Sequence, residues 1–183
     1  MKPIVRVEFG ARNPIEPSEK HIVECDVAPH FPKLAFPSCE VDVLSGSRTF
    51  WEKATLLHML WHRPIEKVRE GTAERQARHY YDLVCLSKHE QGQAALGSEK
   101  QLLGKVAKDK EMLFPAAWAK YPEAVNGSLR LVPEDELQKY LEEDYKKMIS
   151  SGMFGSDPPT WQSIVSELQE LETSINSKEE TSG

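Results

Sequence analysis

The sequence predicts an α+β protein in which a small sheet precedes a bundle of helices. Within the first 46 residues, short segments alternate apolar and polar side chains, which is typical of strands with one covered face. From residue 47 onward, apolar residues recur at helical spacing. Because strands come first and helices afterwards, the order favours an antiparallel or mixed sheet over a wound parallel one. We expect a sheet unit over residues 1–46, a helical lobe over 47–176 and a disordered tail over 177–183.

Within the first 46 residues, strands are expected in three places. Residues 4–9 alternate apolar and polar side chains and end near a glycine. Residues 13–37 contain five prolines, which exclude a long helix and leave room for a short extended piece at 23–27. Residues 40–44 alternate again, and a Ser-Gly pair ends them.

Helices are expected over most of the remaining chain. Ser47 is the expected cap of a first helix over residues 48–62, which Pro64 closes by removing a backbone donor. Residues 115–133 are expected to be irregular and to contain one short strand at 129–132. The later helices are expected over residues 73–89, 99–113, 134–150 and from 160 to the tail.

Composition limits the class of protein. The chain has 183 residues, a formal net charge of −6 and three cysteines, Cys25, Cys39 and Cys85. A negative net charge gives no global reason for nucleic-acid binding, so any basic site must be local. An odd number of cysteines without CxxC spacing indicates reduced thiols. Since no run of about 18 apolar residues occurs, we expect a cytoplasmic protein without a membrane segment.

Lys53 is the most informative position on the first helix. On a helical wheel it falls inside the apolar arc formed by Phe50, Leu56, Leu57 and Leu60. One interpretation is a lysine whose stem packs on the helix pair while its ammonium stays in water. The other is a partly desolvated lysine that binds an anionic ligand such as a triphosphate.

A second charged group is expected on the following helix. Arg75, Arg78, His79 and Asp82 share one face at helical spacing. They form either a self-satisfied cluster that joins two helices, or a phosphate-binding edge whose aspartate orients a basic group. A position facing Lys53 across the helix pair would favour the phosphate-binding edge.

Two sequence segments carry a resemblance to a known family. RTFWEKATLLH at residues 48–58, followed by RHYYDL at residues 78–83, resembles the AbiEii-type nucleotidyltransferase toxins, and the likeness extends from VRVEFGAR at residues 5–12 through the last helices. The resemblance implies part of a polymerase-β-like nucleotidyltransferase sheet followed by helices. It also implies transfer of a nucleotide from an NTP, with Mg²⁺, onto an acceptor such as tRNA, in a type IV toxin–antitoxin system of abortive infection.

The resemblance assigns roles to several residues of this chain. Lys53 would bind substrate phosphate, and Asp82 matches the acidic residue of the last family motif. Glu8 would be a metal-site carboxylate, with Arg6 and Arg12 beside it as phosphate ligands. Arg75 and Arg78 complete the expected phosphate-binding set.

The family's Gly-Ser turn and Asp-x-Asp strand do not precede Glu8 here. We therefore expect a truncated nucleotidyltransferase that is weak or inactive alone. The non-catalytic alternative is a binding module, or a decayed remnant, that pairs its N-terminal strand with a partner chain such as an antitoxin or with a second copy. His58 and His62 have metal-ligand spacing but no glutamate base between them, which favours a packed or solvated pair.

Overall fold

The computed structural model describes residues 14, 16–70, 75–155 and 157–177. The chain divides into two compact units, Met1–Leu44 and Ser45–Gly183, which are described here one at a time. In the described residues the first unit contributes strands and the second contributes helices. The α+β prediction is therefore confirmed.

The first unit contains a β-hairpin. Strands β1 (Ser18–Glu24) and β2 (Ser38–Leu44) pair antiparallel, from Ser18 opposite Leu44 to Glu24 opposite Ser38. The turn between them holds a short 3₁₀ helix, Ala28–His30. The extended piece expected at residues 23–27 is thus displaced toward the N-terminus, because the strand starts directly after Pro17 and the chain turns before Val27. The strand expected at residues 4–9 lies outside the described residues.

The second unit begins with helix α1 (Gly46–His62). Its cap is Ser45 and not Ser47, which corrects the expectation. The Ser45 Oγ accepts the Arg48 backbone N–H at 3.2 Å, whereas the Ser47 hydroxyl donates to the Gln91 carbonyl at 3.0 Å. Ser45 takes this role because its extended backbone precedes the first helical residue.

Seven further helices follow in the described residues. Two of the long ones, α7 and α8, lie close to the expected ranges, while α3 starts four residues later than residue 73. The short helix α6 lies in the stretch expected to be irregular, and α2 and α4 lie where no helix was expected. The ranges are α2 Ile65–Glu70, α3 Ala77–Lys88, α4 Glu90–Leu96, α5 Leu102–Leu113, α6 Tyr121–Val125, α7 Asp135–Ser150 and α8 Trp161–Asn176.

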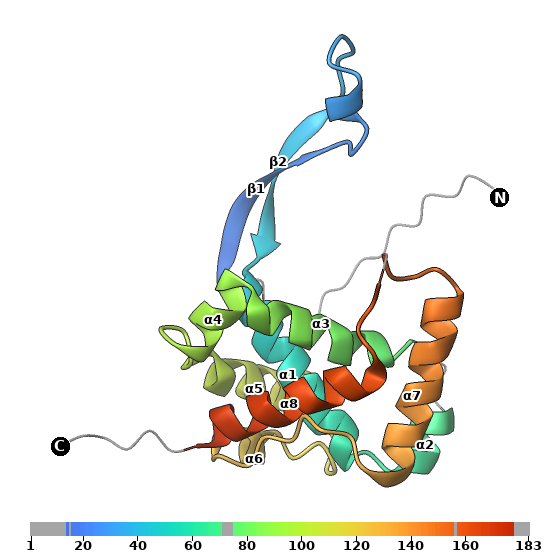
Figure 1. The fold of residues 1–183 in the computed structure, drawn as a ribbon. Coiled ribbons are helices and arrows are strands. Elements are labelled where there is room, and N and C mark those ends of the chain that lie inside the picture. The colour runs from blue at the N-terminus through green and yellow to red at the C-terminus, as the bar shows by residue number, and fades with distance from the viewer. Residues whose placement is uncertain (1–13, 15, 71–74, 156, 178–183) are drawn as a thin grey trace. The chain divides into compact units, whose positions relative to one another are not determined.

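Helix α1 is the centre of this unit, since it packs against α3, α4, α5 and α6, while α3 also packs on α7 and α8. Figure 1 shows α8 crossing the bundle beside α3. The core consists of large apolar side chains from these helices. Among its most buried members are Phe50, Trp51, Leu57, Tyr80, Leu83, Leu141, Tyr145, Ile164 and Leu168.

The chain at residues 129–132 does not form the expected short strand. Its backbone groups are instead satisfied by side chains of α8. The Asn176 side chain bonds both the N–H and the carbonyl of Leu129, at 2.9 and 2.8 Å. The buried carboxylate of Glu172 accepts the N–H groups of Leu131 and Val132. Asn176 therefore belongs to the folded unit, and of the expected tail, residues 178–183 lie outside the described residues.

His58 fastens α1 to the chain that follows α5. The ring is fully buried, its Nε2 donates to the Lys120 carbonyl at 2.9 Å, and its Nδ1 accepts the Arg130 N–H at 3.1 Å. Both nitrogens are therefore occupied by backbone groups when the imidazole is neutral. Burial lowers the pKa of His58 below its ordinary value. His58 is a packed histidine in this fold.

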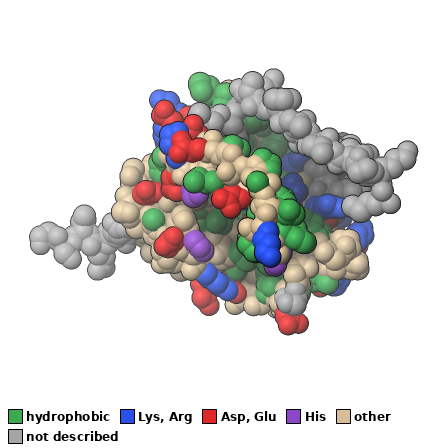
Figure 2. Space-filling model, turned by 90° about the horizontal axis from the view of Figure 1, so that it is seen from above, with side chains coloured by type: hydrophobic (Ala, Val, Ile, Leu, Met, Phe, Trp, Pro, Cys, Tyr) green, Lys and Arg blue, Asp and Glu red, His purple; other side chains and the backbone are tan. Residues whose placement is uncertain are grey.

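The surface carries both signs of charge. Acidic and basic side chains are interspersed on the face seen in Figure 2. In the part of the chain that the structure describes, no helix combines the length and the apolar character needed to cross a membrane.

Candidate functional site

The charged site lies between α1 and α3, where Lys53 meets two side chains of α3. The Lys53 Nζ donates to the Asp82 Oδ2 at 2.7 Å and to the His79 Nδ1 at 3.0 Å. His79 and Asp82 are three residues apart on a helix, so both point to the same side. The residues of the two sequence segments thus meet in space, in the arrangement that favours a phosphate-binding edge.

The protonation state of His79 follows from its surroundings. Burial lowers its pKa to about 4, and the positive charges of Lys53 and Arg78 act in the same direction, while Asp82 opposes them. The ring is therefore neutral near pH 7, and its Nδ1 is free to accept from the ammonium. An ammonium has three N–H groups, so within the described residues one is left for a ligand.

An open pocket of about 450 Å³ lies at this ion pair. The Lys53 side chain is 22% exposed and that of Asp82 is 38% exposed, so both are accessible from solvent. The pocket is lined by Thr49, Lys53, Asp82, Cys85, Leu86 and His89. Cys85 is an unpaired thiol, as are Cys25 and Cys39.

A buried arginine near the start of α1 anchors this helix to α5. Arg48 is 1% exposed, and its guanidinium contacts the Glu52 carboxylate at 3.1 Å and the Asp109 carboxylate at 2.8 Å. A buried charge of this kind needs such partners, because removing one leaves the other uncompensated. The pairs fix the helix that presents Lys53.

Lys110 was not expected at this site. It follows Asp109 on α5, and Arg48 and Lys53 are near enough for their charges to affect its pKa. Burial is the largest influence and lowers the pKa of Lys110, while Glu52 partly offsets this. A signal was present in the sequence, because Lys110 continues the buried stripe of Val106 and Ala107 at helical spacing.

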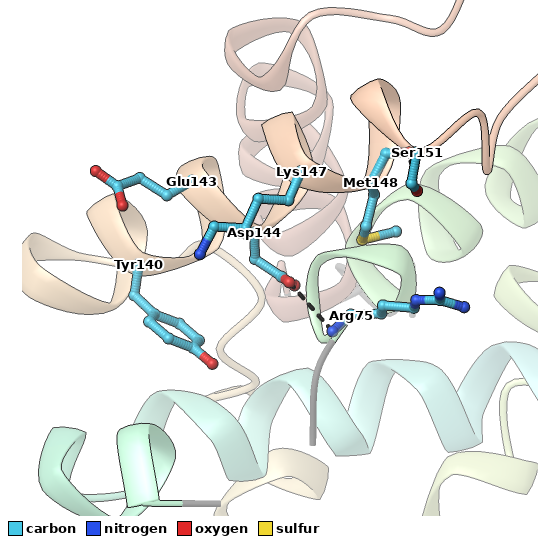
Figure 3. A pocket seen from close by; sticks show the side chains of 7 residues that line it. All are labelled: Arg75, Tyr140, Glu143, Asp144, Lys147, Met148 and Ser151. Atoms are coloured by element: carbon cyan, nitrogen blue, oxygen red, sulfur yellow. Dashed lines mark hydrogen bonds between the residues drawn. The ribbon is translucent and has the colours of Figure 1, made fainter. Parts of the chain in front are cut away.

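The other expected phosphate ligands are placed differently. Arg78 is exposed on α3 and close enough to His79 to lower its pKa. Arg75 does not continue the same helical face, because α3 begins only at Ala77. The Arg75 side chain lines a separate pocket with residues of α7, as Figure 3 shows. There the Asp144 carboxylate accepts the backbone N–H groups of Arg75 and Ala77, at 3.1 and 2.8 Å.

The N-terminal members of the expected site, Arg6, Glu8 and Arg12, lie outside the described residues. Within the described ranges, no three His, Cys, Asp or Glu side chains gather in a way that could hold a metal ion. The acidic groups at Lys53 and Arg48 are already paired with cations. These side chains therefore do not fit a Mg²⁺ site on their own.

The chain matches a known protein family over most of its length. A family model described as "Nucleotidyl transferase AbiEii toxin, Type IV TA system" matches residues 1–167, which include both segments that meet at Lys53. The chain belongs to this family. Neither the curated proteins nor the solved structures gave a match. Membership in a type IV toxin–antitoxin family points to a nucleotide substrate and an antitoxin partner, and its nucleotidyltransferases generally depend on a divalent metal.

Proposed function

We propose that this AbiEii family member transfers a nucleotide from an NTP to an acceptor such as tRNA, and that Lys53 binds the phosphate chain of the NTP. The observation that carries the proposal is the contact of Lys53 with Asp82 and His79 at an accessible pocket. In this proposal the protein acts as the toxin of an abortive-infection system in the cytoplasm. A cognate antitoxin counteracts it.

Lys53 suits this role because its ammonium is positioned before any ligand arrives. Asp82 holds the charge in place, and neutral His79 accepts a hydrogen bond without adding a second positive charge. The remaining N–H can reach a phosphate oxygen, and a charge-assisted bond of this kind is stronger than a neutral one. Asp82 is the positioning residue, and Lys53 contacts the substrate.

The chemistry of transfer explains why a fixed positive charge helps. The acceptor oxygen replaces pyrophosphate at the α-phosphorus of the NTP, and negative charge builds up on the leaving pyrophosphate. A preorganised ammonium stabilises that charge without reorganisation during the reaction. Arg78, one turn before Asp82 and exposed, is in reach of the same face of α3 and would add to the positive potential there.

Two parts of the expected site remain predictions. Glu8 as a Mg²⁺ ligand and Arg6 and Arg12 as phosphate ligands depend on residues outside the described ranges. Pairing of the strand at residues 4–9 with a second copy or a partner depends on the same segment.

The proposal is tested by transfer of label from radiolabelled NTPs to total tRNA in the presence of Mg²⁺. Wild-type protein is compared with Lys53→Met, which keeps the length of the stem, and with Lys108→Met, a change of an exposed lysine on α5. We expect labelling of tRNA that Lys53→Met abolishes and Lys108→Met leaves intact. Absence of labelling by the wild-type chain with every NTP would rule out catalysis by this chain alone.

A further inference from the structure

Lys110 carries a positive charge in a half-buried position on α5. Its helix buries Leu103, Val106 and Ala107, and Lys110 follows them on the same stripe. A lysine at such a position normally has a carboxylate partner, since a desolvated ammonium without one is costly. The role of Lys110 therefore depends on which groups its ammonium contacts.

Among the described residues, Lys110 has neither an ion pair nor a hydrogen bond to a carboxylate. Its Nζ lies over the Phe114 ring, 5.8 Å from the ring centre. Glu52, whose charge affects the pKa of Lys110, and Asp109, its neighbour in the chain, both bind the Arg48 guanidinium. Within the part of the chain that the structure describes, the positive charge of Lys110 is therefore left without a direct counter-ion.

Lys110 and Lys53 lie on two helices, α5 and α1, that pack together. Glu52, next to Lys53, and Asp109, next to Lys110, bind the same Arg48 guanidinium at 3.1 and 2.8 Å, which brings the two lysines to one part of the helical unit. In agreement with this placement, the charge of Lys53 affects the pKa of Lys110, and the charge of Lys110 helps to lower the pKa of His79. Lys53 has a carboxylate partner in Asp82, whereas Lys110 has none among residues 14, 16–70, 75–155 and 157–177. An anion that arrives at Lys53 would supply the charge that Lys110 lacks.

We propose that Lys110 is a second phosphate-binding lysine of this site, so that the phosphate chain of an NTP contacts ammonium groups from both α1 and α5. This inference rests on the proposed function of Lys53 and adds a residue that neither family segment contains. A purely structural lysine would instead stabilise the free protein through its packed stem and its contact with Phe114. The two roles differ in what removal of the charge changes.

The experiment is isothermal titration of the purified chain with inorganic tripolyphosphate at low ionic strength. The proteins are wild type, Lys110→Met, Lys110→Gln, Lys53→Met and the exposed control Lys108→Met. Loss of one charge-assisted contact corresponds to roughly a tenfold weaker affinity or more. We expect that loss for both Lys110 variants and for Lys53→Met, and an unchanged affinity for Lys108→Met.

Urea unfolding without ligand is the second readout. Because both Lys110 variants remove an uncompensated charge, their unfolding midpoints should not fall below that of the wild type. A lower midpoint with unchanged tripolyphosphate affinity would show a structural lysine and overturn the inference. Variants whose unfolding midpoints equal or exceed that of the wild type are folded, so a change in their affinity then comes from the site.

The outcomes separate this inference from the proposed function. If Lys53→Met weakens tripolyphosphate binding and the Lys110 variants do not, the inference fails while the proposed function stands. If the wild-type chain does not bind tripolyphosphate, both fail. A single-stranded RNA oligonucleotide without a 5′ triphosphate is the last probe, and a Lys110 effect confined to that probe would refute the assignment to the NTP.

Discussion

We first develop a prediction about stability that concerns His58, because both hydrogen bonds of its ring lie within the described residues. We consider His58→Leu, which removes the bond to the Lys120 carbonyl and the bond from the Arg130 N–H. Each lost bond leaves a backbone group without its partner, at a cost of about 1–2 kcal/mol. The variant should therefore be less stable than the wild type by roughly 2–4 kcal/mol near pH 7.5.

The difference should shrink in acid, because only the wild type carries the titrating group. The folded state favours neutral His58, whose pKa lies below the ordinary 6.5, so the unfolded chain binds more protons below that pH. The contribution of His58 is complete above about pH 6.5 and is lost as the pH falls. At about pH 5.5 the loss reaches at most about 1.4 kcal/mol.

The assay is urea unfolding of wild type and His58→Leu at both pH values. His79 also has a lowered pKa, but it is present in both proteins and cancels in the comparison. The pKa of His62 is lowered by burial and then by the charge of His58, so it is lowered less in the variant, and this change narrows the gap toward acid in the same direction. A gap between the two proteins that stays constant, or widens, toward acid would refute the claim that His58 is held neutral by the fold.

Three further predictions concern the helical unit. Asp144→Ala should lower the free energy of unfolding by about 1–2 kcal/mol, because it removes the cap of α3, whereas the exposed neighbour Glu143→Ala should change it little; urea unfolding compares the two. Gly92→Ala should destabilise by about 1–3 kcal/mol or prevent folding, since a Cβ would stand 1.9 Å from the Leu86 carbonyl oxygen, and a wild-type melting temperature would contradict this close approach. Glu172→Leu should cost about 2–4 kcal/mol, because two buried backbone N–H groups lose their acceptor, and protection of those amides from hydrogen exchange should fall with it.

The sequence was sufficient to single out a residue when the neighbours that make it unusual lie on the same helix. Lys53 stands out on a helical wheel because its apolar neighbours are close in the chain, and Asp82 belongs to a similar local pattern. Lys110 shows the same kind of signal more faintly, since its stripe on α5 includes the small Ala107. A systematic search for charged residues on buried helical faces would have found it.

The other features of the fold depend on contacts or on a backbone path that a local sequence pattern does not reveal. The Glu172 carboxylate satisfies the amide of Leu131 from 41 residues away, so the missing strand at 129–132 has no nearby signal. Ser45 and Ser47 are both good caps, and only the path of the backbone selects between them. The short helices α2 and α6 have six and five residues, too few to show a full apolar period.

The central claim is that Lys53, held by Asp82, binds the phosphate chain of a nucleotide. Equilibrium binding of NTPs to the purified chain tests it most directly, with Lys53→Met and the exposed control Lys108→Met measured beside the wild type. The account predicts binding that Lys53→Met weakens roughly tenfold or more and Lys108→Met leaves unchanged. Equal affinities of wild type and Lys53→Met for every NTP would contradict it.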